Sequence, residues 1–217
     1  SKLFLMGDRW GGNLGPAVLL KNQDDFLGWI DLDGAHNHAG FFDEYRTVLT
    51  KSANEQIALG NSVDYWQSVL DQVQNIDTTY STENQLRLNS ITVTVDGILV
   101  EDNIINEHRR DFGDDHPKES INKFLWNQRL IGNILDFQEG LGQVSFADRL
   151  HEITIPSLVL WGKHDHSVPL VFAHEAYDNL GSSDKEIFIF ERSAHNPHLT
   201  EPDLFADKVI GFINKHK

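Results

Sequence analysis

Short, mainly apolar runs bounded by turn residues occur near both ends of the chain. They cover residues 3–6, 26–32, 157–161 and 186–190, and each has the length of a strand buried on both faces. Residues 13–21, which are rich in Leu, Val and Ala, and residues 169–180 are helix candidates, and residues 203–215 carry apolar side chains on one helix face. Strands that alternate with helices over short links pair in parallel through right-handed crossovers. The pattern therefore predicts an α/β fold with a parallel sheet flanked by helices.

The middle of the chain, residues 37–150, differs from the ends in composition and in the spacing of its apolar residues. It is more polar than the ends, is rich in Asn, Gln, Asp and Glu, and repeats its apolar residues at helical spacing. We therefore predict a core made of residues 1–36 and 151–217, with residues 37–150 inserted as a mainly helical cap. The stripes that indicate cap helices are Phe41, Phe42, Tyr45, Val48 and Leu49; Val63, Trp66, Val69, Leu70 and Val73; and Phe124, Leu125, Gln128, Ile131 and Leu135.

Residues 90–101 of this middle region fit two structures. Alternation of apolar and polar residues about Asp96 and Gly97 is typical of a hairpin. The same segment, with the residues just before it, also presents four apolar residues on one helix face, namely Leu88, Ile91, Val95 and Leu99. We predict the hairpin.

The turn after the first predicted strand carries the strongest chemical signal. Residues 3–15 read LFLMGDRWGGNLG, in which Gly7, Arg9 and Gly11 form the pattern G-x-Z-x-G between a strand and a helix. In this pattern, the nucleophile elbow, the central residue takes a strained backbone conformation at the tip of the turn, and the flanking glycines let strand and helix approach closely. Arg9 is the central residue, because the tryptophan and two glycines that follow it fix the register.

Arginine cannot act as the nucleophile that this position normally supplies. Its guanidinium has a pKa above ~12, stays protonated and offers no lone pair for attack on a carbonyl. Asp8 has nucleophilic chemistry, since carboxylates attack in some hydrolases, but it stands one position early. If Arg9 points into a crevice, Asp165 or another carboxylate should lie within its reach, because a buried unpaired guanidinium is costly.

An acid and a base follow the elbow, in that order. Asp165 comes just after the strand at 157–161, and His195 comes just after the strand at 186–190. A neutral imidazole can deprotonate a serine hydroxyl, while a carboxylate on its other nitrogen fixes the tautomer and stabilises the imidazolium. Loops at the carboxyl ends of parallel strands can bring such groups to one crevice. We therefore expect the elbow, Asp165 and His195 to form one site.

Three sequence blocks together resemble the α/β-hydrolase family, and within it the prolyl iminopeptidase-like branch with a helical cap. They are MGDRWGGNLG at the elbow, WGKHDHSVP around Asp165 and ERSAHNPHLTEPDLF around His195. The resemblance covers residues 1–36 and 151–217, and it implies hydrolysis of an ester or amide bond through Ser, Asp and His. It puts Asp165 at the family's acid and His195 at its base. It also puts Arg9 at the family's serine, and Trp10 at the residue whose backbone N–H forms half of the oxyanion hole.

The chain departs from the family's pattern at two points. Arg9 replaces the nucleophile serine, and the chain opens on what would be the family's fifth strand, so that four strands and the second oxyanion N–H have no counterpart in it. We therefore expect no serine-hydrolase turnover from this chain as given. Two alternatives are a non-catalytic protein that binds ligands in the crevice, and a dehalogenase-like or epoxide-hydrolase-like enzyme with Asp8 as its nucleophile.

Composition restricts the partners of the chain. Its 217 residues include 18 basic and 33 acidic side chains, and the net charge of −15 disfavours nucleic acid and anionic membrane surfaces. No apolar run approaches the ~20 residues of a membrane span, so we expect a soluble protein, with the cytoplasm favoured. A small molecule or a peptide is the expected substrate. We predict no cofactor. We also predict no metal, because cysteine is absent and zinc spacing is not found in the group His164, His166, His174 and His198.

The strand from Leu3 to Met6 should have an exposed edge. In the family's strand order it pairs on one side with the strand at 26–32 and on the other with a strand that has no counterpart in this sequence. The edge has no charge or proline to discourage pairing. We therefore expect an upstream segment of the same protein, a separate chain or a second copy to cover it, or else the cap or the first residues to fold over it.

Overall fold

A parallel four-stranded sheet forms the centre of the fold. The computed structural model describes residues 3–107 and 144–217. The strands are β1 (Leu3–Asp8), β2 (Phe26–Leu32), β3 (Ser157–Gly162) and β4 (Lys185–Phe190), and they lie in the order β1-β2-β3-β4 with every neighbouring pair parallel. The predicted α/β class and the four predicted strands are confirmed, and no strand end differs from its prediction by more than two residues.

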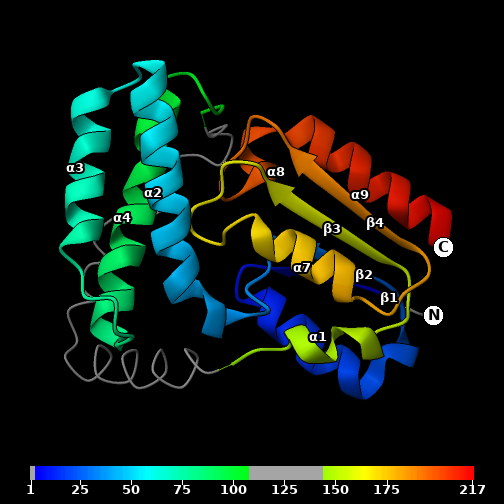
Figure 1. Cartoon of the computed structure of the whole chain (residues 1–217). Coiled ribbons are helices and arrows are strands. Elements are labelled where there is room, and N and C mark those ends of the chain that lie inside the picture. Colours follow the sequence, from blue (N-terminus) through cyan, green and yellow to red (C-terminus); the bar gives the residue numbers. More distant parts are fainter. Residues whose placement is uncertain (1–2, 108–143) are drawn as a thin grey trace, which may run out of the picture.

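Helices cover both faces of this sheet (Figure 1). α1 (Gly11–Asn22) and α7 (Val171–Asn179) lie on one face, while α9 (Pro202–His216) lies on the other. Alternate residues of β2 divide between the two cores, as the period of a strand requires: Trp29 packs on the α1 side, and Ile30 packs with Phe212 of α9. The short helix α8 (Pro197–Thr200) precedes α9, and 3₁₀ turns occupy Gln23–Asp25, His38–Gly40 and Ala147–Glu152. The three predicted core helices are confirmed.

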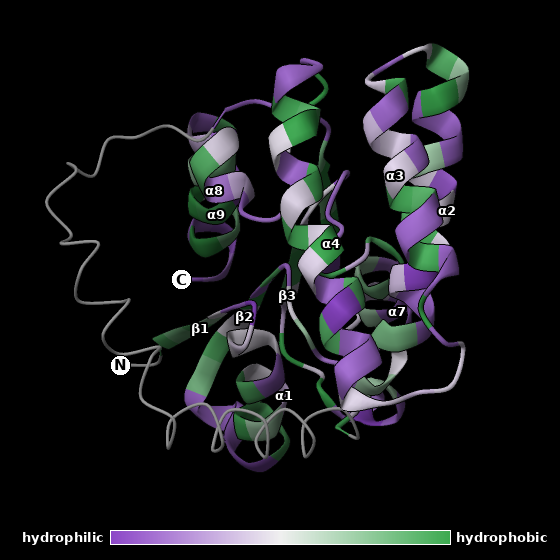
Figure 2. Ribbon diagram, turned by 90° about the vertical axis from the view of Figure 1, so that its left-hand side faces the viewer, coloured by the Kyte–Doolittle hydropathy of each residue, from purple (hydrophilic) through white to green (hydrophobic). Residues whose placement is uncertain are grey.

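Three long helices follow β2 and stand together beside one end of the sheet (Figures 1 and 2). They are α2 (Phe41–Leu59), α3 (Val63–Gln74) and α4 (Thr82–Glu101). The first two predicted stripes are buried as expected, except that Val48 is half-buried and Val63 is exposed. The third stripe, Phe124 to Leu135, lies outside the described residues. The division into a core and a cap remains a prediction.

The predicted hairpin at residues 90–101 is wrong, because these residues belong to the helix α4. Ser81 caps this helix by accepting a hydrogen bond from Asn84 N at 3.1 Å. The four apolar residues at helical spacing form the buried face of this helix, and each is at most 5% exposed: Leu88, Ile91, Val95 and Leu99. Gly97 does not turn the chain, and a Cβ added to it would meet nothing within 4 Å. Burial of one helix face thus outweighs the local β-branched alternation.

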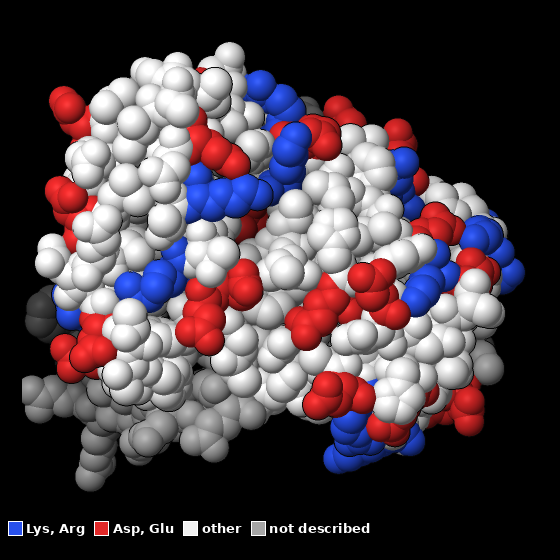
Figure 3. Space-filling model, viewed as in Figure 1, with Lys and Arg blue, Asp and Glu red and all other residues white. Residues whose placement is uncertain are grey.

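Charged side chains of both signs lie on the surface. On the face shown in Figure 3, Lys and Arg are interspersed with Asp and Glu. The chain as a whole remains strongly acidic, with a net charge of −15. Within residues 3–107 and 144–217, no helix is long and apolar enough to cross a membrane.

Candidate active site

The turn between β1 and α1 has the strained backbone of a nucleophile elbow. Arg9 stands at its tip with a φ of 55°, in the left-handed region that non-glycine residues rarely adopt. Its N–H donates to Leu32 O at 3.1 Å, and its carbonyl accepts from Gly12 N at 2.8 Å and from Ala35 N at 3.0 Å. Backbone hydrogen bonds on both sides of Arg9 therefore hold the strained residue in place.

Glycines allow the strand, the turn and the helix to approach one another this closely. A Cβ added to Gly7 would lie 2.4 Å from Gly11 O, and one added to Gly12 would lie 2.2 Å from Gly34 Cα. Both neighbours are backbone atoms that cannot move aside like a flexible side chain. The elbow predicted from the glycine spacing is confirmed as a backbone structure.

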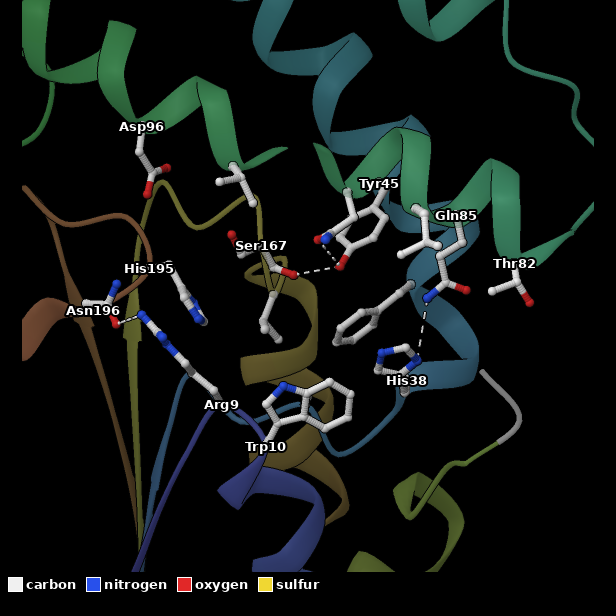
Figure 4. Close-up of a pocket in the computed structure, with 16 residues that line it drawn as sticks. Arg9, Trp10, His38, Tyr45, Thr82, Gln85, Asp96, Ser167, His195 and Asn196 are labelled. Carbon is white, nitrogen blue, oxygen red and sulfur yellow. Dashed lines mark hydrogen bonds between the residues drawn. The ribbon is translucent and has the colours of Figure 1, made fainter. Parts of the chain in front are cut away.

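The Arg9 side chain is exposed and lines a pocket at this end of the sheet. Its Nη2 donates to Asn196 Oδ1, and Figure 4 shows the side chain extending toward that amide. Among the described residues Arg9 forms no ion pair, so an amide replaces the expected carboxylate partner. Asp8 is the last residue of β1 and does not line the pocket. Arg9, and not Asp8, therefore occupies the tip of the turn.

Asp165 and His195 meet beyond the carboxyl ends of β3 and β4. His195 Nδ1 lies 2.8 Å from Asp165 Oδ2, and Asp165 Oδ1 accepts hydrogen bonds from the backbone N–H groups of Ser167 and Val168, each at 2.8 Å. Asp165 is 1% exposed and His195 is 9% exposed. Because the carboxylate holds Nδ1, Nε2 is the ring nitrogen that can exchange a proton in the pocket.

Opposing effects set the charge of His195. Burial lowers its pKa, but the charge and hydrogen bond of Asp165 and the charge of Asp33 outweigh burial and raise the pKa to about 9. The charge of Arg9 acts in the lowering direction. His195 is therefore largely an imidazolium at neutral pH, with both ring nitrogens as donors.

Asp33 is a site residue that sequence reasoning did not select. It follows β2, is fully buried and has a φ of 44°. Its Oδ1 accepts from Gly162 N and its Oδ2 accepts from Asn196 N, both at 3.1 Å, so it ties the end of β3 to the loop that carries His195. Burial and the charge of Asp165 raise the pKa of Asp33 well above its ordinary value. Its position after a parallel strand was the available signal.

The pocket has a volume of about 540 Å³ and lies between the carboxyl ends of the strands and the helices α2 and α4. On one side His38 is stacked between Trp10 and Phe41, with ring centroids 5.5 Å and 4.6 Å away. Tyr45 of α2 donates to Ser167 O at 2.9 Å, which links this helix to the loop after β3. Burial and the charge of Asp165 raise the pKa of Tyr45, so the phenol stays protonated and remains a donor.

Asp96 of α4 is the second site residue that sequence reasoning did not select. It lines the pocket, and Figure 4 shows it across from Arg9 and His195. Its Oδ1 is buried without a hydrogen-bond partner among the described residues. Burial and the charge of Asp165 raise the pKa of Asp96 to about 7, while His195 and Arg9 lower it. The wrong hairpin prediction for this segment concealed its place in the pocket.

The candidate metal ligands beside the pocket take part in hydrogen bonds. Asp33, Asp165 and His195 offer ligand atoms within 4.8 Å of one another, but each oxygen of the two carboxylates already accepts a hydrogen bond. His166 is 2% exposed, and both of its ring nitrogens have partners. Its Nδ1 lies 2.8 Å from His164 O, and its Nε2 lies 2.9 Å from Ser52 Oγ. His166 therefore links the loop after β3 to α2. This arrangement fits a hydrogen-bonded cluster better than a metal centre.

Comparisons with known sequences identify hydrolases. No family model matches the chain. The probable aminopeptidase YbaC of Bacillus subtilis is 39% identical over 228 residues, which cover 100% of this chain and 66% of that protein. A proline iminopeptidase of Heyndrickxia coagulans is 32% identical over 85 residues, covering 39% of this chain and 26% of its own length. A pimeloyl-[acyl-carrier protein] methyl ester esterase of Vibrio vulnificus is 36% identical over 75 residues, covering 35% of this chain and 29% of the esterase. The chain thus spans just under two thirds of the Bacillus subtilis relative.

Solved structures share the fold. The serine hydrolase CarC, involved in carbazole degradation, aligns with a TM-score of 0.56 and 16% identity over 99% of this chain and 64% of its own. An esterase of Exiguobacterium antarcticum aligns with a TM-score of 0.55 and 16% identity over 99% of this chain and 67% of its own. An α/β fold family hydrolase of Bacillus anthracis aligns with a TM-score of 0.51 and 19% identity over 100% of this chain and 67% of its own. At these identities the likeness concerns the sheet and its helices.

Proposed function

We propose that this chain, which belongs to the α/β-hydrolase family and to its prolyl iminopeptidase-like branch, binds a small molecule or peptide without the serine-dependent turnover of a hydrolase. The observation that carries the proposal is Arg9 at the tip of the elbow, with a φ of 55°. The position that would present a nucleophile to a carbonyl carbon here presents a guanidinium. A protonated guanidinium has no lone pair with which to form an acyl intermediate.

The remainder of the site supports binding. The pocket keeps a volume of about 540 Å³, an aromatic wall and the hydrogen-bonded pair of Asp165 and His195. In a serine hydrolase this pair would take the proton of the nucleophile and return it to the leaving group. Without a nucleophile it can still orient a ligand by donating from His195 Nε2. The Asp8 alternative has no support in the geometry, since Asp8 does not line the pocket.

The test compares Arg9 with Arg9→Ser in protein expressed from the complete open reading frame. The measurements are labelling by a fluorophosphonate probe and hydrolysis of an activated ester and an amino-acid arylamide, at pH 7 and pH 9. We expect the serine variant to be labelled and the Arg9 protein not to be, since loss of the nucleophile costs on the order of 10⁶ in rate in a comparable triad.

The control is the double variant Arg9→Ser with His195→Ala, in which labelling should be lost again. A probe that labels the single and the double variant equally would report an exposed hydroxyl and not a working triad. Turnover by the Arg9 protein that disappears in His195→Ala would overturn the proposal.

A further inference from the structure

We propose that the pocket selects ligands with one carboxylate group on an apolar body, and that Arg9 and His195 Nε2 bind the carboxylate. The inference rests on the proposed function, because it assigns a ligand class to the same pocket. Three features carry it: the exposed guanidinium, the orientation of the imidazole and the single acid across the pocket.

The guanidinium of Arg9 is the first feature. One of its nitrogens donates to Asn196 Oδ1, which anchors the side chain in the pocket. The other two nitrogens have no hydrogen-bond partner among residues 3–107 and 144–217, and Arg9 has no ion pair there. Asn196 in turn is held by the bond from its backbone N–H to Asp33. A positioned guanidinium with donors to spare is suited to a planar carboxylate.

His195 adds a second donor beside Arg9. Asp165 holds Nδ1 at 2.8 Å, so Nε2 is the ring nitrogen that His195 can offer to the pocket it lines. With a pKa raised to about 9 the ring carries a proton on Nε2 at neutral pH. The charge of Arg9 opposes this protonation, and an anion between the two groups would remove their mutual repulsion. An anion that contacts both Arg9 and His195 is therefore bound more favourably than an anion that contacts only one of them.

The start of α1 contributes in the same direction. This 12-residue helix begins at Gly11, directly after Arg9 and Trp10, and its first turn contains no acidic side chain. The positive end of its dipole therefore lies at the same place as the guanidinium. The attraction is local, because the chain has a net charge of −15 and acidic side chains are spread over the face shown in Figure 3.

The remaining walls define the rest of the ligand. Trp10, Phe41 and Val93 line the pocket with apolar surface, which suits an aryl or alkyl body. Asp96 faces the pocket from α4, and its carboxyl becomes charged near neutral pH, with a pKa of about 7. A second anionic group on the ligand would be repelled there. The walls thus favour a monocarboxylate over a dicarboxylate.

Binding of phenylacetate, measured by calorimetry and by the NMR shift of the His195 ring, tests the inference against 2-phenylacetamide. The amide has the same shape without the charge. We expect phenylacetate to bind about tenfold more tightly or better, since hydrogen bonds to charged groups contribute that much. Arg9→Gln should weaken the preference, because His195 Nε2 then remains as the cationic donor without the guanidinium beside it. Lys21→Gln, which removes an equal charge from the exposed last turn of α1, should leave it intact.

Inorganic phosphate distinguishes a carboxylate site from a general anion site. It should bind more weakly than phenylacetate, because it cannot use the apolar walls. The inference is overturned if phenylacetate does not bind at millimolar concentration, if the amide or phosphate binds equally well, or if Arg9→Gln keeps the preference undiminished. Turnover by the Arg9 protein would overturn the proposed function and leave the carboxylate preference standing, so the two failures are distinguishable.

Discussion

The elbow and the acid–base pair, the two halves of the site, are held in place by different means. At the elbow the backbone determines the structure: Arg9 keeps a φ of 55° because glycines pack against backbone around it. In the other half, side chains determine the structure, since Asp165 holds His195 through one oxygen and two backbone N–H groups through the other.

Because of this difference, the shape of the elbow is independent of its central side chain, whereas the acid–base half depends on particular side chains. No backbone hydrogen bond that shapes the elbow involves the side chain of residue 9, so the turn does not depend on which side chain stands there. At residue 165 the side chain itself holds the structure, because the buried Asp165 carboxylate accepts three hydrogen bonds.

The largest effect is expected from glycine substitution in the elbow. Gly12→Ala places a Cβ where Gly34 Cα lies 2.2 Å away, and neither backbone can yield. We expect the free energy of unfolding to fall by about 3 kcal/mol or more. Denaturant titration followed by circular dichroism measures it.

The matched control is Gly11→Ala, one position earlier on α1. A Cβ there meets nothing within 4 Å, so the substitution should change the free energy of unfolding by at most about 1 kcal/mol, in the stabilising direction. Equal losses from the two substitutions would show that close packing at Gly12 does not hold the elbow.

Asp165→Asn tests the other half. It removes the charge that stabilises the His195 imidazolium, and we expect a loss of about 2–3 kcal/mol at pH 6. The pKa of His195 is raised from 6.5 to about 9, so its contribution to stability is fully present below pH 6.5 and is lost as pH rises through about 9. The difference in stability between the wild-type protein and Asp165→Asn should therefore shrink over that window.

Equilibrium unfolding of both proteins between pH 6 and pH 9.5 measures this difference, and NMR should show a lower His195 pKa in the variant. The control is Ser182→Ala, at a buried residue that does not line the pocket, and its stability loss should not follow this pH window. A difference that grows from pH 6 to pH 9.5 would contradict the assigned role of Asp165.

The sequence is sufficient to predict the parts of the site whose signals are local. Strand runs, glycine spacing and polar residues after strands lead directly to Arg9, Asp165 and His195, because each of these patterns reflects a constraint within about ten residues. The fold class follows from the same runs. The distance from His195 to Asp165 then confirms that the two residues meet.

The parts that escaped prediction depend on contacts between distant segments. Asp33 is important because it joins Gly162 and Asn196, which lie far from it in the sequence. Asp96 lines the pocket only because residues 82–101 form a helix, and local alternation favoured a hairpin there. The amide partner of Arg9 was not predicted for a similar reason, since the exposure of the guanidinium could not be judged from neighbouring residues.

The two outer strands of the sheet, β1 and β4, differ in how their edges are protected. β4, beside the acid–base half, protects its edge with charge: Lys185 and Glu186 lie in the strand, and Lys208 lies 4.1 Å from the centre of the Phe188 ring. β1 leads into the elbow with Leu3 66% exposed and Met6 45% exposed. We propose that another strand, from an upstream segment, a separate chain or a second copy, covers this edge.

Met6→Lys tests the edge in the 217-residue chain. If a second copy pairs with β1, the substitution should weaken association about tenfold, because it removes one buried apolar side chain from the contact. Sedimentation at low micromolar concentration, with hydrogen exchange at Phe4 and Leu5, measures this. A stable monomer in which those amides exchange at the same rate before and after substitution would show that no copy pairs there.

The smallest expected effect concerns the one electrostatic link between the two halves that involves Arg9. The charge of Arg9 lowers the pKa of His195, against the stronger raising effect of Asp165. Arg9→Ala should therefore raise the His195 pKa, by less than about one pH unit because water screens an exposed guanidinium. Titration of the His195 ring by NMR measures the shift. Arg9→Lys, which keeps the charge, should titrate like the wild-type protein. A lower pKa in Arg9→Ala would contradict the assigned charge effect.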